Sequence, residues 1–170
     1  SQVTITYTSG NCSGAGTGGD GDSGDNPGDN SGECTWELVT DASTLKAGDR
    51  VVIAAKDYNY AMSTDQKSNN RGQTSITKNN SNITFGNDVQ ILTLSDGKSA
   101  GTLAFNTGSG YLYAASSDNN YLRTENTLSD NSSWTITIAA DGTATIVAQG
   151  LNTRNTMQYN QSSSLFACYS

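Results

Sequence analysis

Tyrosine, asparagine and arginine side chains recur together in the part of the chain that follows residue 34. They gather near the ends of three segments: Tyr58, Tyr60, Asn70 and Arg71; then Tyr111, Tyr113, Asn120, Tyr121 and Arg123; then Arg154, Asn155, Tyr159 and Asn160. Aromatic faces stack on the C–H surfaces of sugar rings, while amide and guanidinium groups hydrogen-bond to neighbouring hydroxyls. These residues are therefore the candidate ligand contacts, and the ligand that they suit is a glycan. The alternative is that the tyrosines form core and that the Asn and Arg side chains satisfy loop carbonyl groups.

The composition offers few of the side chains on which enzyme active sites depend. The chain contains no histidine, which removes Ser-His-Asp triads, Cys-His pairs and the usual metal-binding motifs. Most aspartates after residue 34 stand beside Gly, Asn, Ser or Ala, where an Asp side chain caps its own turn. A pair of carboxylates facing one cleft, as in a glycosidase, is the remaining catalytic alternative. We expect a protein that is not an enzyme and that uses no cofactor and no metal.

The charge is unevenly distributed along the chain. The formal net charge is -7, and five acidic residues fall in one short stretch: Asp20, Asp22, Asp25, Asp29 and Glu33. The remainder is close to neutral, and no Lys/Arg cluster alternates with aromatic residues as nucleic-acid binding would require. No run approaches the roughly 20 apolar residues of a membrane-spanning helix. We therefore expect neither a nucleic-acid partner nor membrane insertion.

Residues 10–34 are rich in Gly, Asp and Ser and poor in apolar side chains. Such a composition cannot offset the backbone entropy lost on ordering, so it predicts a disordered, flexible linker. A calcium-binding loop is the alternative, because clustered carboxylates suit hard cations, although the EF-hand spacing is not met.

Three cysteines leave an odd thiol. Cys12 and Cys34 bracket the predicted linker, and a bridge between them would close a loop within it. A Cys34–Cys168 bridge would instead join the two ends of the folded module, and the sequence does not choose between them. Cys168 lies between Phe166 and Tyr169 in an alternating run, which also suits a small buried apolar residue.

The chain from residue 35 to residue 170 consists of short alternating apolar runs separated by Gly, Asn, Asp and Ser, which predicts an all-β domain. An offset of 53 superimposes Tyr58-Asn-Tyr60 on Tyr111-Leu-Tyr113, and an offset of 45 carries Leu112 onto Met157 and Tyr121 onto Phe166. The same offsets make Trp36, Val89 and Trp134 equivalent. Three repeats follow, at about 35–88, 89–132 and 133–170. Three copies of four strands predict a β-trefoil-like barrel of about twelve short strands.

Residues 1–9 form a separate alternating run, with Val3, Ile5 and Tyr7 on one face. A lone strand cannot satisfy its own edges, so it predicts the last strand of a preceding β domain. The alternative is that it pairs with the downstream module.

Two resemblances add to this interpretation. The run SWTITIAADGTATIVAQGLNTRNTMQY resembles a subunit of ricin-type β-trefoil lectins, but the Gln-x-Trp signature of that family is missing from every copy. We therefore transfer none of that family's sugar-binding residues. The runs LKAGDRVVIAA, GYLYAASSDNNYLRT and TRNTMQYN are more similar to C-terminal accessory β domains of secreted multidomain gut-bacterial proteins of the Bacteroidetes type. This resemblance implies an extracellular or cell-surface location.

Together these observations favour a non-catalytic, lectin-like accessory module of a secreted or surface-exposed multidomain protein. Its expected partners are a glycan, either a polysaccharide or a glycoprotein sugar, and the upstream domain of the same chain. The alternative is a structural spacer or protein-interaction domain with no sugar site, in which every large aromatic side chain would be buried.

Overall fold

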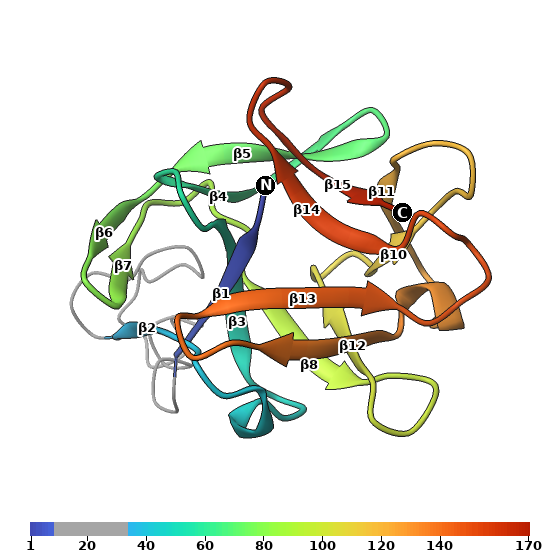
Figure 1. The fold of residues 1–170 in the computed structure, drawn as a ribbon, viewed down its shortest axis with the longest axis horizontal. Coiled ribbons are helices and arrows are strands. Elements are labelled where there is room, and N and C mark those ends of the chain that lie inside the picture. Colours follow the sequence, from blue (N-terminus) through green and yellow to red (C-terminus); the bar gives the residue numbers. More distant parts are fainter. Residues whose placement is uncertain (9–33) are drawn as a thin grey trace.

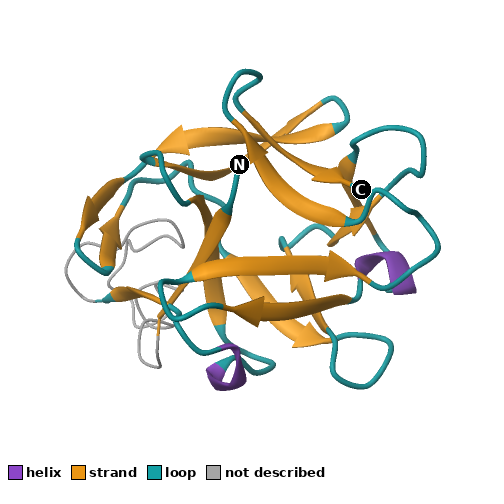
Figure 2. Cartoon of the chain, viewed as in Figure 1, coloured by secondary structure: helices purple, strands orange, loops and turns teal. Residues whose placement is uncertain are grey.

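A computed structural model describes residues 1–8 and 34–170 of the chain. Nearly all of the predicted linker lies outside these residues. So do Cys12 and the acidic stretch for which a calcium-binding loop was the alternative. The described chain is built of strands, and its only helical turns are two short 3₁₀ turns, η1 at Ala42–Thr44 and η2 at Asp130–Ser132 (Figure 2). The prediction of an all-β protein is confirmed.

The strands join in one large antiparallel sheet. Their bounds are β1 Val3–Thr8, β2 Trp36–Leu38, β3 Arg50–Ala55, β4 Tyr60–Lys67, β5 Asn70–Ser75, β6 Thr77–Asn79, β7 Asn82–Thr84, β8 Leu92–Asp96, β9 Leu103–Asn106, β10 Tyr111–Ala114, β11 Leu122–Glu125, β12 Trp134–Ile138, β13 Thr143–Ala148, β14 Thr156–Asn160 and β15 Leu165–Tyr169.

Six of these strands pair in a closed ring, in the order β1, β3, β8, β9, β12, β13 and back to β1. Each of three strand pairs in the ring is followed along the chain by a hairpin, which is β4–β5, β10–β11 or β14–β15. Figure 1 shows β1 and β3 running side by side through the centre, with β13 beside β1 and the three hairpins toward the upper part of the view. Three short strands, β2, β6 and β7, lie outside both sets.

The pairing register repeats three times around the ring. Within the strand pairs, the facing residues are Ile5 and Ile53, Leu94 and Phe105, and Ile136 and Ile146. Between the pairs, the facing residues are Val3 and Ala144, Leu92 and Val51, and Trp134 and Leu103. Val3, Leu92 and Trp134 thus hold the same position in the three strand pairs.

The predicted equivalence of Trp36, Val89 and Trp134 is wrong. Trp36 lies on β2, which pairs with β1 and β7 outside the ring. It packs with Val89 in a second, smaller core cluster, whereas Trp134 belongs to the main one. The reason is that the ring position next to β3, which the repeat assigned to the run around Trp36, is occupied by β1.

The interpretation of residues 1–9 as the last strand of a preceding domain is therefore also corrected. All six residues of β1 pair with β3, from Val3 opposite Ala55 to Thr8 opposite Arg50. Val3 and Ile5 are almost completely buried in the main core. Residues 1–8 belong to the same sheet as the downstream module, which is the alternative that the sequence left open.

The hairpins correct one further detail of the repeat. Tyr159 pairs with Phe166 on β14–β15, and Ala114 pairs with Leu122 on β10–β11. Leu122, rather than Tyr121, is therefore the buried counterpart of Phe166. A shift of one residue moves a side chain to the other face of a strand, so Tyr121 lies outside the core.

The structure shows whether Cys34 and Cys168 form a disulfide bridge. Cys34 is engaged in a disulfide, whereas Cys168 is a free thiol buried in the main core. The Cys34–Cys168 bridge is therefore wrong, and the interpretation of Cys168 as a small buried residue is confirmed. Burial raises the pKa of the Cys168 thiol far above its ordinary value, because the low-dielectric core disfavours the thiolate.

Candidate functional site

The predicted contact residues do not gather in one place. Part of the set is committed to hydrogen bonds inside the protein, part lies on the β10–β11 hairpin and the adjacent loops, and part lines a hollow at the β14–β15 hairpin. The three groups differ in how much of each side chain a ligand could reach.

Arg71 is a structural residue. Its side chain is 4% exposed, and its guanidinium donates to the Ser63 carbonyl at 3.2 Å, to Gln90 Oε1 at 2.9 Å and to Gln66 Oε1 at 3.0 Å. Burial lowers the pKa of Arg71, and the charge of Asp65 opposes this effect. The guanidinium fastens the end of the β4–β5 hairpin to Gln90, so it is not available to a ligand.

A second group lies where the β10–β11 hairpin meets β5. The guanidinium of Arg123 stands 4.7 Å from the centre of the Tyr121 ring and also donates to Asn69 Oδ1. Asn70 Oδ1 accepts from the backbone N–H of Leu122 at 3.0 Å. Both polar side chains thus bind this hairpin to the neighbouring one.

Two tyrosines share the outer face of the same hairpin. Tyr113 lies opposite Arg123, and Tyr111 lies opposite Glu125. All four side chains are half-buried, so a ligand could reach only part of each.

Arg154, Asn120 and Asn155 stabilise the loops beside this hairpin. Arg154 Nη1 donates to Asn120 Oδ1 at 2.9 Å, and the Asn155 carbonyl accepts from the N–H of Ala148 at 2.9 Å. The first of these hydrogen bonds joins the Asn120 loop to the loop that contains Arg154 and Asn155, and the second joins that loop to the end of β13.

Tyrosines gather at the third hairpin. Tyr159 is buried, and its ring packs against Tyr58 at 5.6 Å, Tyr60 at 6.4 Å and Phe166 at 5.0 Å between ring centres. Its hydroxyl donates to Gln73 Oε1. Burial raises the pKa of Tyr159. Tyr159 thus supports the cluster, and Tyr58, which is 37% exposed, is the most exposed ring of the cluster.

A hollow of about 390 Å³ adjoins this cluster. Its lining residues are Ser1, Tyr58, Gln158, Tyr159, Asn160, Gln161, Ser162 and Tyr169. Asn160 Nδ2 donates to the Tyr169 hydroxyl at 2.8 Å, while Asn160 Oδ1 accepts from the Ser163 N–H at 3.0 Å. The hollow therefore combines one exposed aromatic side chain, Tyr58, with the hydrogen-bonded pair of Asn160 and Tyr169.

Sequence reasoning found Tyr58, Tyr159 and Asn160 but missed Gln158, Gln161 and Tyr169. The alternation of β14 and β15 could have identified two of them. Gln158 and Asn160 are two residues apart and flank the buried Tyr159, so they share the outer face of the hairpin. Tyr169 follows the buried Cys168 and lies on that face as well.

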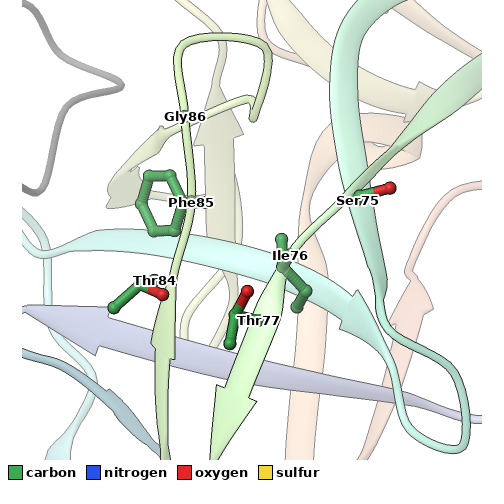
Figure 3. Close-up of a pocket in the computed structure, with 6 residues that line it drawn as sticks. All are labelled: Ser75, Ile76, Thr77, Thr84, Phe85 and Gly86. Carbon is green, nitrogen blue, oxygen red and sulfur yellow. The ribbon is translucent and has the colours of Figure 1, made fainter.

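A second hollow, of about 360 Å³, lies at the β6–β7 hairpin. Figure 3 shows Thr77 and Thr84 side by side on the two strands, with Phe85 beyond Thr84. Phe85 also packs edge-on against Trp36 at 5.3 Å. The polar side chains in its lining are the hydroxyls of Ser75, Thr77 and Thr84, so it offers fewer kinds of hydrogen-bonding group than the hollow beside Tyr58.

Within the described parts of the chain, no three His, Cys, Asp or Glu side chains are grouped as a metal would require. No helix in residues 1–8 and 34–170 has the length and apolar character to cross a bilayer. Comparisons of the chain with protein-family models, with curated proteins and with solved structures found no significant match.

Proposed function

We propose that this protein is a non-catalytic carbohydrate-binding module and that the hollow beside Tyr58 binds the sugar. The observation that carries the proposal is the open ring of Tyr58 next to the hydrogen-bonded pair of Asn160 and Tyr169. A sugar ring needs a flat aromatic surface for its C–H face and directional polar groups for its hydroxyls, and this hollow offers both.

The size of the hollow supports the same ligand class. Its volume of about 390 Å³ lies within the roughly 300–1,000 Å³ of typical small-molecule sites. Gln158 and Gln161 add amide groups at the rim, each with two donors and an acceptor for sugar hydroxyls. The hollow would hold one or two sugar residues at the end or along the side of a longer glycan.

For the fold, we propose a β-trefoil-like arrangement. The ring of six strands, the three hairpins and the register that repeats three times support it. In such an arrangement the three hairpins are related by pseudo-threefold symmetry, yet only β14–β15 carries the Asn160–Tyr169 pair. Sugar binding would therefore occur at one of three related places.

For the location, we propose a secreted or surface-exposed protein. The disulfide at Cys34 supports this proposal, because such bonds persist in oxidising compartments and are rare in the cytosol. The module would hold an attached domain close to its glycan.

The test is a glycan array probed with the full chain, followed by calorimetric titration of the best ligand against a Tyr58→Ala variant. Loss of the stacking face predicts a roughly tenfold weaker affinity. Tyr113→Ala is the matched control, because it removes a tyrosine from another hairpin, and it is expected to bind like the parent. Absence of binding to every glycan would reject the proposal in favour of a spacer or protein-interaction domain. Equal affinities of the parent and Tyr58→Ala would reject the hollow beside Tyr58 as the sugar site.

A further inference from the structure

A pocket of about 210 Å³ lies on the outer face of β1, and none of the residues that the sequence suggested as ligand contacts lines it. Its floor is made by Thr4 and Thr6, which alternate with the core residues Val3 and Ile5, and by Ala54, which lies opposite Thr4 on β3. These small side chains leave the space that larger residues would fill. The pocket is thus part of the sheet itself rather than a gap between loops.

The walls of the pocket are apolar on one side and charged on the other. Leu38 and Ile83 supply the apolar wall, and the charged residues are Lys56, Asp57, Lys78 and Asp141. Two positive and two negative groups leave no net charge, so the wall offers both strong donors and strong acceptors.

Lys78 is held in place before any ligand arrives. Its ammonium donates to the carbonyls of Ala55 at 2.8 Å and Lys56 at 2.9 Å. An ammonium has three donors, so one N–H remains for a further acceptor. Partial burial lowers the pKa of Lys78, and the nearby charge of Asp57 opposes this effect.

Thr6 and Asp57 are two more polar groups of the pocket that could bind a ligand. The hydroxyl of Thr6 is buried and has no hydrogen-bond partner among the described residues. Asp57 is exposed at the rim. A buried hydroxyl without a partner is costly, and a ligand or a water molecule that supplies one would recover that cost.

The β12–β13 turn closes the side of the pocket next to Leu38. Asp141 accepts from the Thr143 N–H at 2.9 Å and lies 3.5 Å from Lys56 Nζ. Gly142 has a φ of +92°, and a Cβ atom there would approach the Leu38 side chain to 2.7 Å. Glycine at this position therefore allows the turn, with Asp141, to lie against the apolar wall.

We propose that this pocket binds a single neutral monosaccharide residue, at a site separate from the hollow beside Tyr58. The ligand class rests on the proposed function. A pyranose places an apolar C–H face against Leu38 and Ile83 and offers hydroxyls that accept from Lys78 and donate to Asp57. The volume is below the range of drug-sized ligands, which limits the occupant to one sugar ring. The balanced charges favour a neutral sugar over a uronic acid or an amino sugar.

The test is an NMR titration of the labelled full chain with glucose, galactose and mannose, and with glucuronate and glucosamine as charged counterparts. The proposal predicts shifts of the Thr4, Thr6 and Ala54 signals for at least one neutral sugar, and weaker effects from both charged sugars. The variant Asp57→Asn is expected to weaken that binding about tenfold, because it replaces a charged acceptor. Asp118→Asn, an exposed aspartate in the β10–β11 loop, is the matched control and is expected to leave binding unchanged.

The two sites report separately in this experiment. Shifts confined to Tyr58, Asn160 and Tyr169 would overturn the pocket proposal and leave the proposed function standing. Shifts confined to the pocket, sensitive to Asp57→Asn, would support the pocket and reject the hollow. Binding at the pocket that is unaffected by Asp57→Asn, or that favours a charged sugar, would overturn the chemistry proposed for it. No shift at either site would reject both.

Discussion

Truncation of Ile5 tests whether β1 is part of the folded core. Ile5 is fully buried and lies opposite Ile53, among the residues that fill the ring. An Ile→Ala change at such a site removes buried methyl and methylene groups and leaves a cavity, which costs about 2–5 kcal/mol. For a chain of this size the expected fall in melting temperature is about 10 °C. A domain with an ordinary stability of about 5–15 kcal/mol would survive the change but with a much smaller margin.

The assay is urea unfolding followed by the fluorescence of Trp36 and Trp134, both of which are buried. The free energy of unfolding of the Ile5→Ala variant should fall while the dependence on urea stays the same. Leu151→Ala is the control, because that side chain is 93% exposed and its truncation should change stability by less than about 0.5 kcal/mol. Superimposable curves for the parent and Ile5→Ala would refute the assignment of β1 to this core.

Two further predictions concern ionisable groups. Cys168 should resist iodoacetamide in the native protein and react after unfolding, since burial raises the pKa of its thiol and blocks access; peptide mapping of the alkylated protein would reveal native labelling if this is wrong. Hydrogen bonds from Ser43 lower the pKa of Asp41 below the 3.8 of an unperturbed aspartate, so its contribution to stability is complete above pH 3.8 and is lost as the pH falls through the lower, folded-state value. Melting temperatures measured from neutral to acidic pH should therefore fall less steeply for Asp41→Asn than for the parent, and parallel curves would count against this assignment.

Strand content was predictable from the sequence because it depends on local alternation. The runs at Arg50–Ala55, Trp134–Ile138 and Thr143–Ala148 alternate or are continuously apolar, and each forms a strand of the ring. Which strands pair with one another was harder to predict from the sequence. The run around Trp36 has the same alternation as the one around Trp134, and local pattern alone does not reveal that Val3–Thr8 takes its place beside β3.

The candidate contacts show the same limit. Arg71 and Arg154 both stand beside an Asn in a loop or at a strand end, yet the acceptors that Arg71 engages include Gln90, far along the chain. The pocket on β1 was missed entirely, because its residues come from five separate segments that meet only in the folded sheet. Side chains that gather from distant strands leave no signature of spacing in the sequence.

The position of β1 has a consequence for the order in which the chain assembles. Of the six ring strands, β1 is synthesised first, whereas β13, one of its two ring neighbours, is synthesised last. Contacts between such distant segments form slowly, because the entropy of closing a long loop is lost before the contacts themselves stabilise the chain. β1 can pair early with β3, but its pairing with β13 forms only after the other ring strands have been synthesised. Thr4, Thr6 and Thr8 keep one face of β1 polar, which limits the tendency of this strand to aggregate before it pairs with β13.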